Sequence, residues 1–230
     1  METSSLEHYS QLLSLAVHEL RTPASVVDGY LRMLLRDTDP PYSDRQRKMM
    51  DEAGKSCARI VALIGELSDI GKFDAGLITL NRERLDTFAL AGEVATGVRE
   101  AVDRHVHLAI RGDPSGAPMA GDAGRLRTAF EAIFRAILRE KPGPSTVVAE
   151  RRRDMIEGRH CAVLVVADEG RVQDAYAAPR GRFDDKRGGM GLALPLARRI
   201  IELHDGWLWS PAADDQLARG SAILALPLVE

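Results

Sequence analysis

The sequence predicts an α+β protein that begins with a hairpin of two helices and continues into an α/β sandwich. Two observations support this class. Two stretches within residues 6–73 carry apolar residues at steps of three and four, which is the spacing of amphipathic helices. After residue 77, short apolar runs alternate with helical patterns, as is typical of layered α/β domains. We therefore expect two domains, residues 1–76 and residues 77–230.

The first helix is expected to present a histidine to water. Its apolar residues follow the a and d positions of a helix that packs against other helices. They are Leu6, Tyr9, Leu13, Ala16, Leu20, Pro23, Val27, Tyr30 and Leu34. Counted from Leu13 at a, His18 falls at position f, opposite this seam. Glu19 adjoins it and Thr22 lies one turn further along the same face, while Pro23 is expected to bend the helix just past His18.

The second helix is expected to begin at a capping box formed by Ser43 and Gln46, after a turn over residues 37–43. Gly76 is a plausible stop for it. Its apolar positions are Met50, Ala53, Cys57, Ile60, Ile64 and Leu67. A single hairpin leaves half of each apolar stripe exposed, so we expect a homodimer in which two copies pack as a four-helix bundle through residues 6–73.

The remaining residues are expected to form a sheet with three helices. Strands are predicted at residues 77–80, 106–110, 147–152, 161–167 and 220–228, and helices at residues 87–102, 123–140 and 192–203. Residues 147–152 and 161–167 are interpreted as a hairpin. The second of these runs is continuously apolar, which predicts a central strand, and residues 220–228 are expected to close the sheet.

Composition narrows the classes of function. The chain is 45% hydrophobic and 28% charged, which is enough apolar material for a core beyond the hairpin. No apolar run is long enough for a bilayer and the first residues lack signal-peptide features, so we expect a cytoplasmic chain without membrane insertion. The net charge of -3 gives no reason to expect nucleic-acid binding. Cys57 and Cys161 are expected as buried thiols, and no metal site is predicted.

Two turns of the second part are candidates for a binding site, and each has a simpler interpretation. Asp168 and Gly170 follow the buried run, where an Asp-x-Gly pattern is commonly only a turn. Residues 188–192 open a helix whose free N–H groups can bind phosphate, or they form a flexible hinge. Four basic residues between these turns carry positive charge that suits either a polyphosphate or water, and most of them are interpreted as solvated charges: Arg180, Arg182, Lys186 and Arg187.

The run His-Glu-Leu-Arg-Thr-Pro at residues 18–23 resembles the phosphoacceptor box of sensor histidine kinases, the enzymes of two-component signalling. The resemblance implies that His18 is phosphorylated on a ring nitrogen and that Glu19 orients the ring and accepts its other proton. It implies that Thr22 helps to place water for dephosphorylation. It also implies a response-regulator receiver domain as the partner. Residues 67–76 are similar to the family's exit from the helical bundle.

The second part resembles the histidine-kinase type of ATPase domain, most clearly over residues 192–206, which match the family's glycine box and following helix. This implies ATP and Mg²⁺ as cofactors. Asp168 would accept a hydrogen bond from the adenine amino group, and Gly170, Gly189 and Gly191 would lie near the nucleotide. Arg139 stands where relatives place a phosphate-facing lysine.

Three positions depart from the family pattern. Residues 122–126 resemble the start of the family's asparagine helix, yet Ala132 and Ala136 replace its two asparagines, one of which holds magnesium. Alanine has no oxygen to offer, whereas Mg²⁺ takes near-octahedral oxygen ligands. Val172 replaces the second glycine that follows Asp168, so the backbone is less able to approach a ligand.

Two hypotheses about function follow from the resemblance. In the first, the chain is a histidine protein kinase that autophosphorylates His18 from ATP and passes the phosphoryl group to a response-regulator aspartate. In the second, Ala132 and Ala136 mark a catalytically degenerate member. Such a member would act as a histidine phosphotransfer relay, as a phosphatase that uses Thr22, or as a scaffold.

Overall fold

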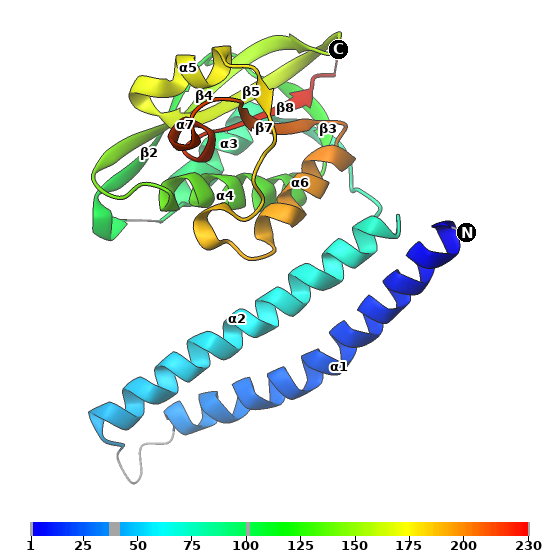
Figure 1. The fold of residues 1–230 in the computed structure, drawn as a ribbon, viewed down its shortest axis with the longest axis vertical. Coiled ribbons are helices and arrows are strands. Elements are labelled where there is room, and N and C mark those ends of the chain that lie inside the picture. Colours follow the sequence, from blue (N-terminus) through cyan, green and yellow to red (C-terminus); the bar gives the residue numbers. More distant parts are fainter. Residues whose placement is uncertain (1, 37–41, 100–101, 230) are drawn as a thin grey trace. The chain divides into compact units, whose positions relative to one another are not determined.

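The computed structural model describes residues 2–36, 42–99 and 102–229, with side chains described at residue 13 and from residue 15 onward. The chain forms two compact units, one that ends at Ile78 and one that comprises Thr79–Glu230. Figure 1 shows the first as a pair of helices and the second as a sheet with helices around it. Within the described ranges, no helix combines the length and apolar character that crossing a bilayer requires. The predicted order of a helical hairpin and an α/β domain is confirmed.

The hairpin consists of α1 (Glu2–Arg36) and α2 (Asp44–Asp74). The capping box is confirmed, because the Gln46 N–H donates to Ser43 Oγ at 3.3 Å and the Ser43 N–H donates to Gln46 Oε1 at 3.0 Å. The α1 helix continues through Pro23 and curves along its length (Figure 1). Gly76 has a φ of +66° just past the end of α2, which only glycine adopts at little cost. Most of the predicted turn at residues 37–43 lies outside the described residues.

Apart from Leu13, which lies against Gly71 of α2, the residues that pack inside one hairpin are not those of the predicted α1 seam. Val17 and Cys57 are buried, and Cys57 Sγ donates to the Ala24 carbonyl across the hairpin at 3.2 Å. The described seam residues of α1 with large side chains are instead 42–64% exposed at Leu20, Val27, Tyr30 and Leu34. On α2, Ala53 and Ile60 are also exposed. The apolar pattern therefore covers a wider face of α1 than α2 of the same chain can bury.

The second unit contains a six-stranded sheet in the order β2-β4-β5-β8-β7-β6. Its strands are β2 (Val106–Gly112), β4 (Ser145–Ile156), β5 (Arg159–Asp168), β6 (Arg180–Gly181), β7 (Trp207–Pro211) and β8 (Ala222–Pro227). β2 runs parallel to β4, and the other neighbours pair antiparallel. Residues 161–167 of β5 are fully buried between β4 and β8, so the predicted hairpin and central strand are confirmed.

Helices cover both faces of this sheet. One face carries α3 (Thr87–Gly97), α4 (Ala123–Arg139) and α6 (Ala193–Leu203), as Figure 1 shows. The other carries α5 (Val172–Ala177) and α7 (Asp215–Arg219), which share an apolar cluster with β5 and β8. Short 3-10 turns lie at Val102–Arg104, Glu169–Arg171 and Arg187–Gly189. The predicted helices at residues 123–140 and 192–203 are confirmed, and the one at 87–102 is shorter than expected.

Two strand predictions need correction. Residues 77–80 form no strand; the nearby strand is β1 (Glu83–Asp86), which pairs antiparallel with β3 (Pro118–Gly121). The final strand β8 does not lie at the edge of the sheet, because it pairs with both β5 and β7. Neither β3 nor β7 was among the predicted strands. Short strands depend on a partner that is distant in sequence, and local apolar patterns do not encode that pairing.

Candidate functional site

His18 lies on the outward face of α1. The preceding residue, Val17, is 4% exposed, and successive side chains are about 100° apart around a helix, so His18 turns away from the hairpin interior. The His18 and Glu19 side chains are 79% and 70% exposed. His18 Nδ1 lies 3.3 Å from Glu19 Oε1. The carboxylate thus holds one ring nitrogen, and Nε2 is the nitrogen that another protein can reach.

Thr22 is exposed one helical turn after His18, on the same side of α1. Three large apolar side chains are also exposed on this side: Leu15, Val26 and Met33. Leu15 lies seven residues before Thr22, and Val26 and Met33 lie four and eleven residues after it, which is the spacing of a continuous helix face. The accessible histidine is therefore bordered by a hydroxyl and by apolar surface.

The residues predicted to bind nucleotide lie in the other unit, around α4 and the glycine segment, residues 187–191. Ala132 and Ala136 are 5% and 0% exposed on α4. Gly188 has a φ of +62°, and a Cβ added to it would lie 2.9 Å from both the Cα and the carbonyl oxygen of Ala136. The glycine segment therefore rests directly on the turn of α4 where the family resemblance implies a magnesium-holding asparagine.

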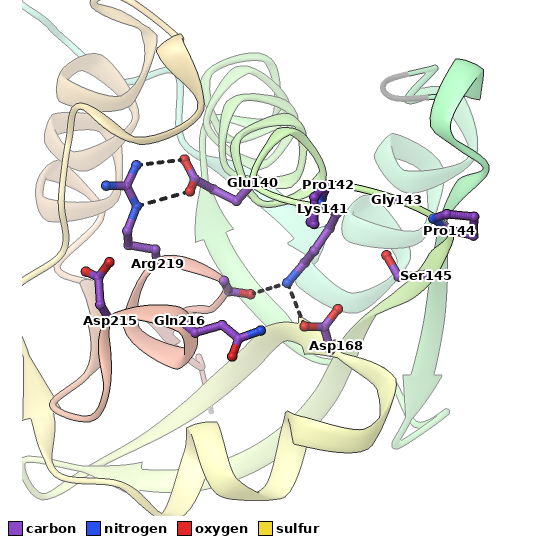
Figure 2. A pocket seen from close by; sticks show the side chains of 11 residues that line it. Glu140, Lys141, Pro142, Gly143, Pro144, Ser145, Asp168, Asp215, Gln216 and Arg219 are labelled. Atoms are coloured by element: carbon purple, nitrogen blue, oxygen red, sulfur yellow. Dashed lines mark hydrogen bonds and ion pairs between the residues drawn. The ribbon is translucent and has the colours of Figure 1, made fainter.

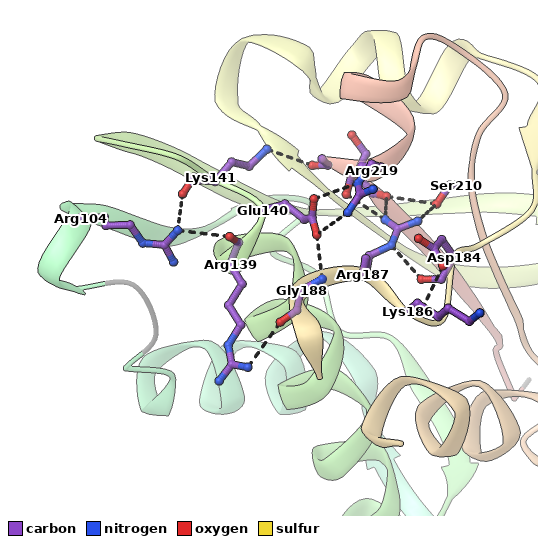
Figure 3. A network of polar contacts seen from close by, with 12 residues as sticks. Arg104, Arg139, Glu140, Lys141, Asp184, Lys186, Arg187, Gly188, Ser210 and Arg219 are labelled. Atoms are coloured by element: carbon purple, nitrogen blue, oxygen red, sulfur yellow. Dashed lines mark hydrogen bonds and ion pairs between the residues drawn. The ribbon is translucent and has the colours of Figure 1, made fainter. Parts of the chain in front are cut away.

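Arg187 anchors the glycine segment from inside the protein. Arg187 is 1% exposed. Its guanidinium donates to the carbonyls of Asp184, Arg219 and Ser221 and to Ser210 Oγ (Figure 3). It also lies 4.2 Å from the centre of the Phe183 ring. Burial lowers the pKa of Arg187 to about 10, so the side chain stays charged at neutral pH. Arg187 is therefore not one of the solvated charges expected among the basic residues of this segment.

Glu140 receives three donors at the end of α4. The Gly188 N–H donates to its Oε1 at 2.7 Å, and Arg219 Nε and Nη2 donate to its two oxygens at 3.1 and 3.3 Å (Figure 3). Burial is the largest influence on the pKa of Glu140 and raises it. The bonds from Arg219 and Gly188 together outweigh burial, so the pKa lies below its usual range.

Asp168, at the end of β5, is paired with a buried lysine. Lys141 Nζ donates to Asp168 Oδ2 at 2.8 Å and to the Gly220 carbonyl at 3.1 Å (Figure 2). The Lys141 side chain is 7% exposed and the Asp168 side chain 38%. This pair borders an open cavity of about 850 Å³, whose polar lining includes Ser145, Asp215, Gln216 and Arg219.

The other predicted nucleotide residues are more scattered. Gly170 lies in the 3-10 turn after β5, and Val172 begins α5 and is 5% exposed in the apolar cluster. Gly189 and Gly191 have φ values of +58° and +65° in the glycine segment. Arg139 reaches that segment, where its Nη1 donates to the Gly188 carbonyl at 3.4 Å. The structure brings Arg139 to the glycines but pairs Asp168 with Lys141 instead.

In this arrangement the predicted residues do not fit a magnesium–triphosphate. A polyphosphate needs free N–H groups at the glycine segment, and the ion needs oxygen ligands. The Gly188 N–H is bonded to Glu140, and residue 136 is an alanine covered by Gly188.

Sequence reasoning missed Glu140, Lys141 and Arg219. Lys141 precedes a Pro-Gly-Pro run that indicates only a turn, and its burial depends on Gly220, which is distant in sequence. One signal for Glu140 was present. An acidic residue at the C-terminal end of a helix opposes the helix dipole, so a carboxylate there needs donors from elsewhere.

The first unit of the chain matches a known domain family. Residues 9–76 match the His Kinase A (phospho-acceptor) domain. The sensor protein DivL of Caulobacter vibrioides is 29% identical over 197 residues, which cover 83% of this chain and 25% of DivL. The probable sensor histidine kinase TcrY of Mycobacterium tuberculosis is 28% identical over 205 residues, which cover 85% of this chain and 42% of TcrY.

The chain thus matches the phospho-acceptor domain of histidine kinases near its start and is similar to sensor histidine kinases over most of its length. It spans a quarter of DivL and less than half of TcrY. Its fold is also that of full-length ShkA, solved in complex with AMPPNP, with a TM-score of 0.71 at 19% identity over 95% of this chain and 46% of ShkA. The predicted resemblance to sensor histidine kinases and the predicted fold class are therefore confirmed.

Proposed function

We propose that this chain is a histidine phosphotransfer protein of two-component signalling, in which His18 exchanges a phosphoryl group with an aspartate of a response-regulator receiver domain. The observation that carries the proposal is the accessibility of His18 next to Glu19. Residues 1–76 would form the phosphoacceptor domain. Residues 77–230 would form a histidine-kinase-like domain that does not itself supply the phosphoryl group.

The contact between His18 and Glu19 suits this chemistry. A proton on Nδ1 is shared with the Glu19 carboxylate, which leaves the lone pair on Nε2 as the nucleophile. Nε2 attacks the phosphorus of an aspartyl phosphate, the N–P bond forms, and the P–O bond breaks to release the aspartate as a carboxylate. The positive charge on the phosphorylated ring is offset by Glu19. The reverse step returns the phosphoryl group to an aspartate.

The surroundings of His18 support a protein partner. The exposed apolar residues Leu15 and Val26 give a receiver domain a surface beside Thr22 and His18. Thr22 would help to place the water that removes a phosphoryl group from the partner. On a separate face, the exposed seam of α1 supports a homodimer, since a second hairpin would cover Leu20, Val27 and Leu34. By resemblance to its relatives, we place the reaction in the cytoplasm.

The second candidate is an ATP-dependent autokinase, with ATP and Mg²⁺ held by the second unit. The fold shared with ShkA, a protein solved with an ATP analogue, favours it. The contacts of Gly188 and Ala136 favour the phosphotransfer role instead, because they leave neither a free glycine amide at Gly188 nor a magnesium ligand at residue 136.

Labelling from two phosphoryl donors separates these candidates. The full chain is incubated with receiver domains from its own genome charged with ³²P-acetyl phosphate, and separately with Mg²⁺ and γ-³²P-ATP. We expect acid-labile label on the chain from a receiver domain and none from ATP. His18→Ala should abolish the label, whereas His107→Ala, which changes an exposed histidine of β2, should retain it. Label from ATP would favour the autokinase, and label that survives in His18→Ala would overturn the site.

A further inference from the structure

The glycine segment and Arg219 together present a set of donors that converges on one carboxylate. The Gly188 N–H is 2.7 Å from Glu140 Oε1, and Arg219 offers two guanidinium N–H groups to the same carboxylate. A backbone amide in a positive-φ turn beside a guanidinium is a donor set suited to a phosphate or carboxylate group. Here the anion comes from the chain itself. The Glu140 side chain is 16% exposed, so these bonds are largely shielded from water.

The glycine segment is held in this position from two sides. Gly188 rests on Ala136, where even a methyl group would be too close. Arg187, the residue before it, is bound inside the domain to Ser210 of β7 and to the carbonyl of Ser221, next to β8 (Figure 3). Arg219 links the two sides, because its carbonyl accepts from Arg187 while its guanidinium binds Glu140. Opening the segment toward a ligand therefore requires the Gly188–Glu140 bond to break.

We propose that Glu140 is an internal anion that occupies the donors of the glycine segment that could bind phosphate. By doing so it prevents polyphosphate ligands from binding to the domain. The proposal deepens the proposed function, because it names the contact that keeps the second unit from holding a phosphoryl donor. It does not depend on the chemistry of His18. A polyphosphate and the Glu140 carboxylate would compete for the Gly188 N–H and the Arg219 guanidinium.

The test uses the full chain and its Glu140→Gln variant. Glutamine keeps the size and one acceptor oxygen but removes the charge that competes with phosphate. Inorganic tripolyphosphate, with and without Mg²⁺, is titrated by calorimetry, with ADP as a second probe. The matched control is Glu93→Gln, which neutralises an exposed glutamate that also accepts from an arginine, Arg127, at 2.6 Å.

The proposal predicts no tripolyphosphate binding at millimolar concentration by the native chain or by Glu93→Gln. Glu140→Gln should bind it at least about tenfold more tightly, since a charge-assisted competitor has been removed. Hydrogen exchange at the Gly188 amide should rise in Glu140→Gln and remain slow in the control. If the change to glutamine leaves the Gly188 bond in place, Glu140→Ala removes the acceptor altogether and should show both effects.

Two results would overturn the proposal. One is equal binding by the native chain and both Glu140 variants, which would show that the carboxylate does not compete. The other is a result in which both Glu140 variants have the thermal transition of the native chain, yet their Gly188 amides exchange at the native rate and neither variant binds tripolyphosphate. Neither result bears on label transfer to His18, so failure of this proposal is distinguishable from failure of the phosphotransfer role.

Discussion

Lys141 Nζ lies 2.8 Å from Asp168 Oδ2 and joins the end of α4 to the end of β5. The lysine also donates to Gly220, which precedes β8, so three segments meet at one ammonium group. The Lys141 side chain is almost fully buried, whereas that of Asp168 is more than a third exposed. A buried ammonium needs a negative partner, and in this domain Asp168 supplies it. The residue assigned to adenine thus has a structural role.

Asp168→Asn should destabilise the second unit because it leaves the Lys141 ammonium with a neutral partner. We expect a loss of about 2 kcal/mol in the free energy of unfolding, below the value for a fully buried pair because Asp168 is partly exposed. Urea unfolding followed by the fluorescence of Trp207 and Trp209 reports on this unit. Asp215→Asn, an exposed acid on the rim of the same cavity, is the control and should change little.

A thermodynamic cycle checks that the loss comes from the pair. In the double variant Lys141→Met/Asp168→Asn the buried charge is gone, so the loss should be smaller than the sum of the two single losses. Additive losses would mean that the two side chains act independently.

The burial of His204 predicts that the free energy of unfolding falls in mild acid. The ring is 2% exposed; its Nε2 accepts from the Asp122 N–H at 2.9 Å, and Nδ1 lies 2.7 Å from the Ile200 carbonyl. Burial is the main cause that lowers the pKa of His204 below 6.5, so the folded state favours the neutral ring. Its contribution is fully present above the unfolded pKa of about 6.5 and is lost as the pH falls below that value.

The free energy of unfolding of the full chain should therefore decrease as the pH falls below about 6.5. His204→Gln should flatten this part of the profile, although the variant will be less stable at every pH. His18→Gln changes a histidine whose side chain is 79% exposed and should leave the profile unchanged. An equal slope in the native chain and His204→Gln would assign the effect to other groups.

Two adjacent valines of α1 provide a test of the homodimer. Val27 belongs to the exposed seam and is 51% exposed, whereas Val26 lies on the side of Thr22 and is 50% exposed. Val27→Glu would bury a carboxylate between two hairpins and should convert dimer to monomer in sedimentation velocity at micromolar concentration. Val26→Glu should remain dimeric. Identical behaviour of the two variants would argue against the seam as the dimer interface.

Glu19→Gln tests the role of the carboxylate beside His18. The amide keeps the size of the side chain but no longer offsets the charge of a phosphorylated ring. We expect transfer from a receiver domain to slow by about tenfold to a hundredfold, while the stability stays the same because the side chain is 70% exposed. Glu52→Gln, which changes an exposed glutamate bonded to Lys55 on α2, serves as control. Unchanged transfer in Glu19→Gln would remove Glu19 from the mechanism.

The hairpin could be predicted from the sequence because its information is local. Helical periodicity placed His18 opposite the seam, and a two-residue capping box marked the start of α2. The continuous apolar run of β5 predicted its central position for the same reason, since burial on both faces removes polar residues from every position. The sequence also has Ala132 and Ala136 where the family resemblance implies asparagines.

The contacts around the glycine segment could only be seen in the folded chain. The sequence alone gives no sign that Arg187 is buried. Its burial is possible because Ser210 and Ser221 accept its hydrogen bonds, and both lie far from it in the sequence. The donors of Glu140 come from Gly188 and Arg219, and no periodicity links those positions. Sequence patterns determine which face of an element is apolar and which side chain meets solvent. Pairing of buried charges depends on which distant elements the fold brings together, and the tertiary structure alone decided it.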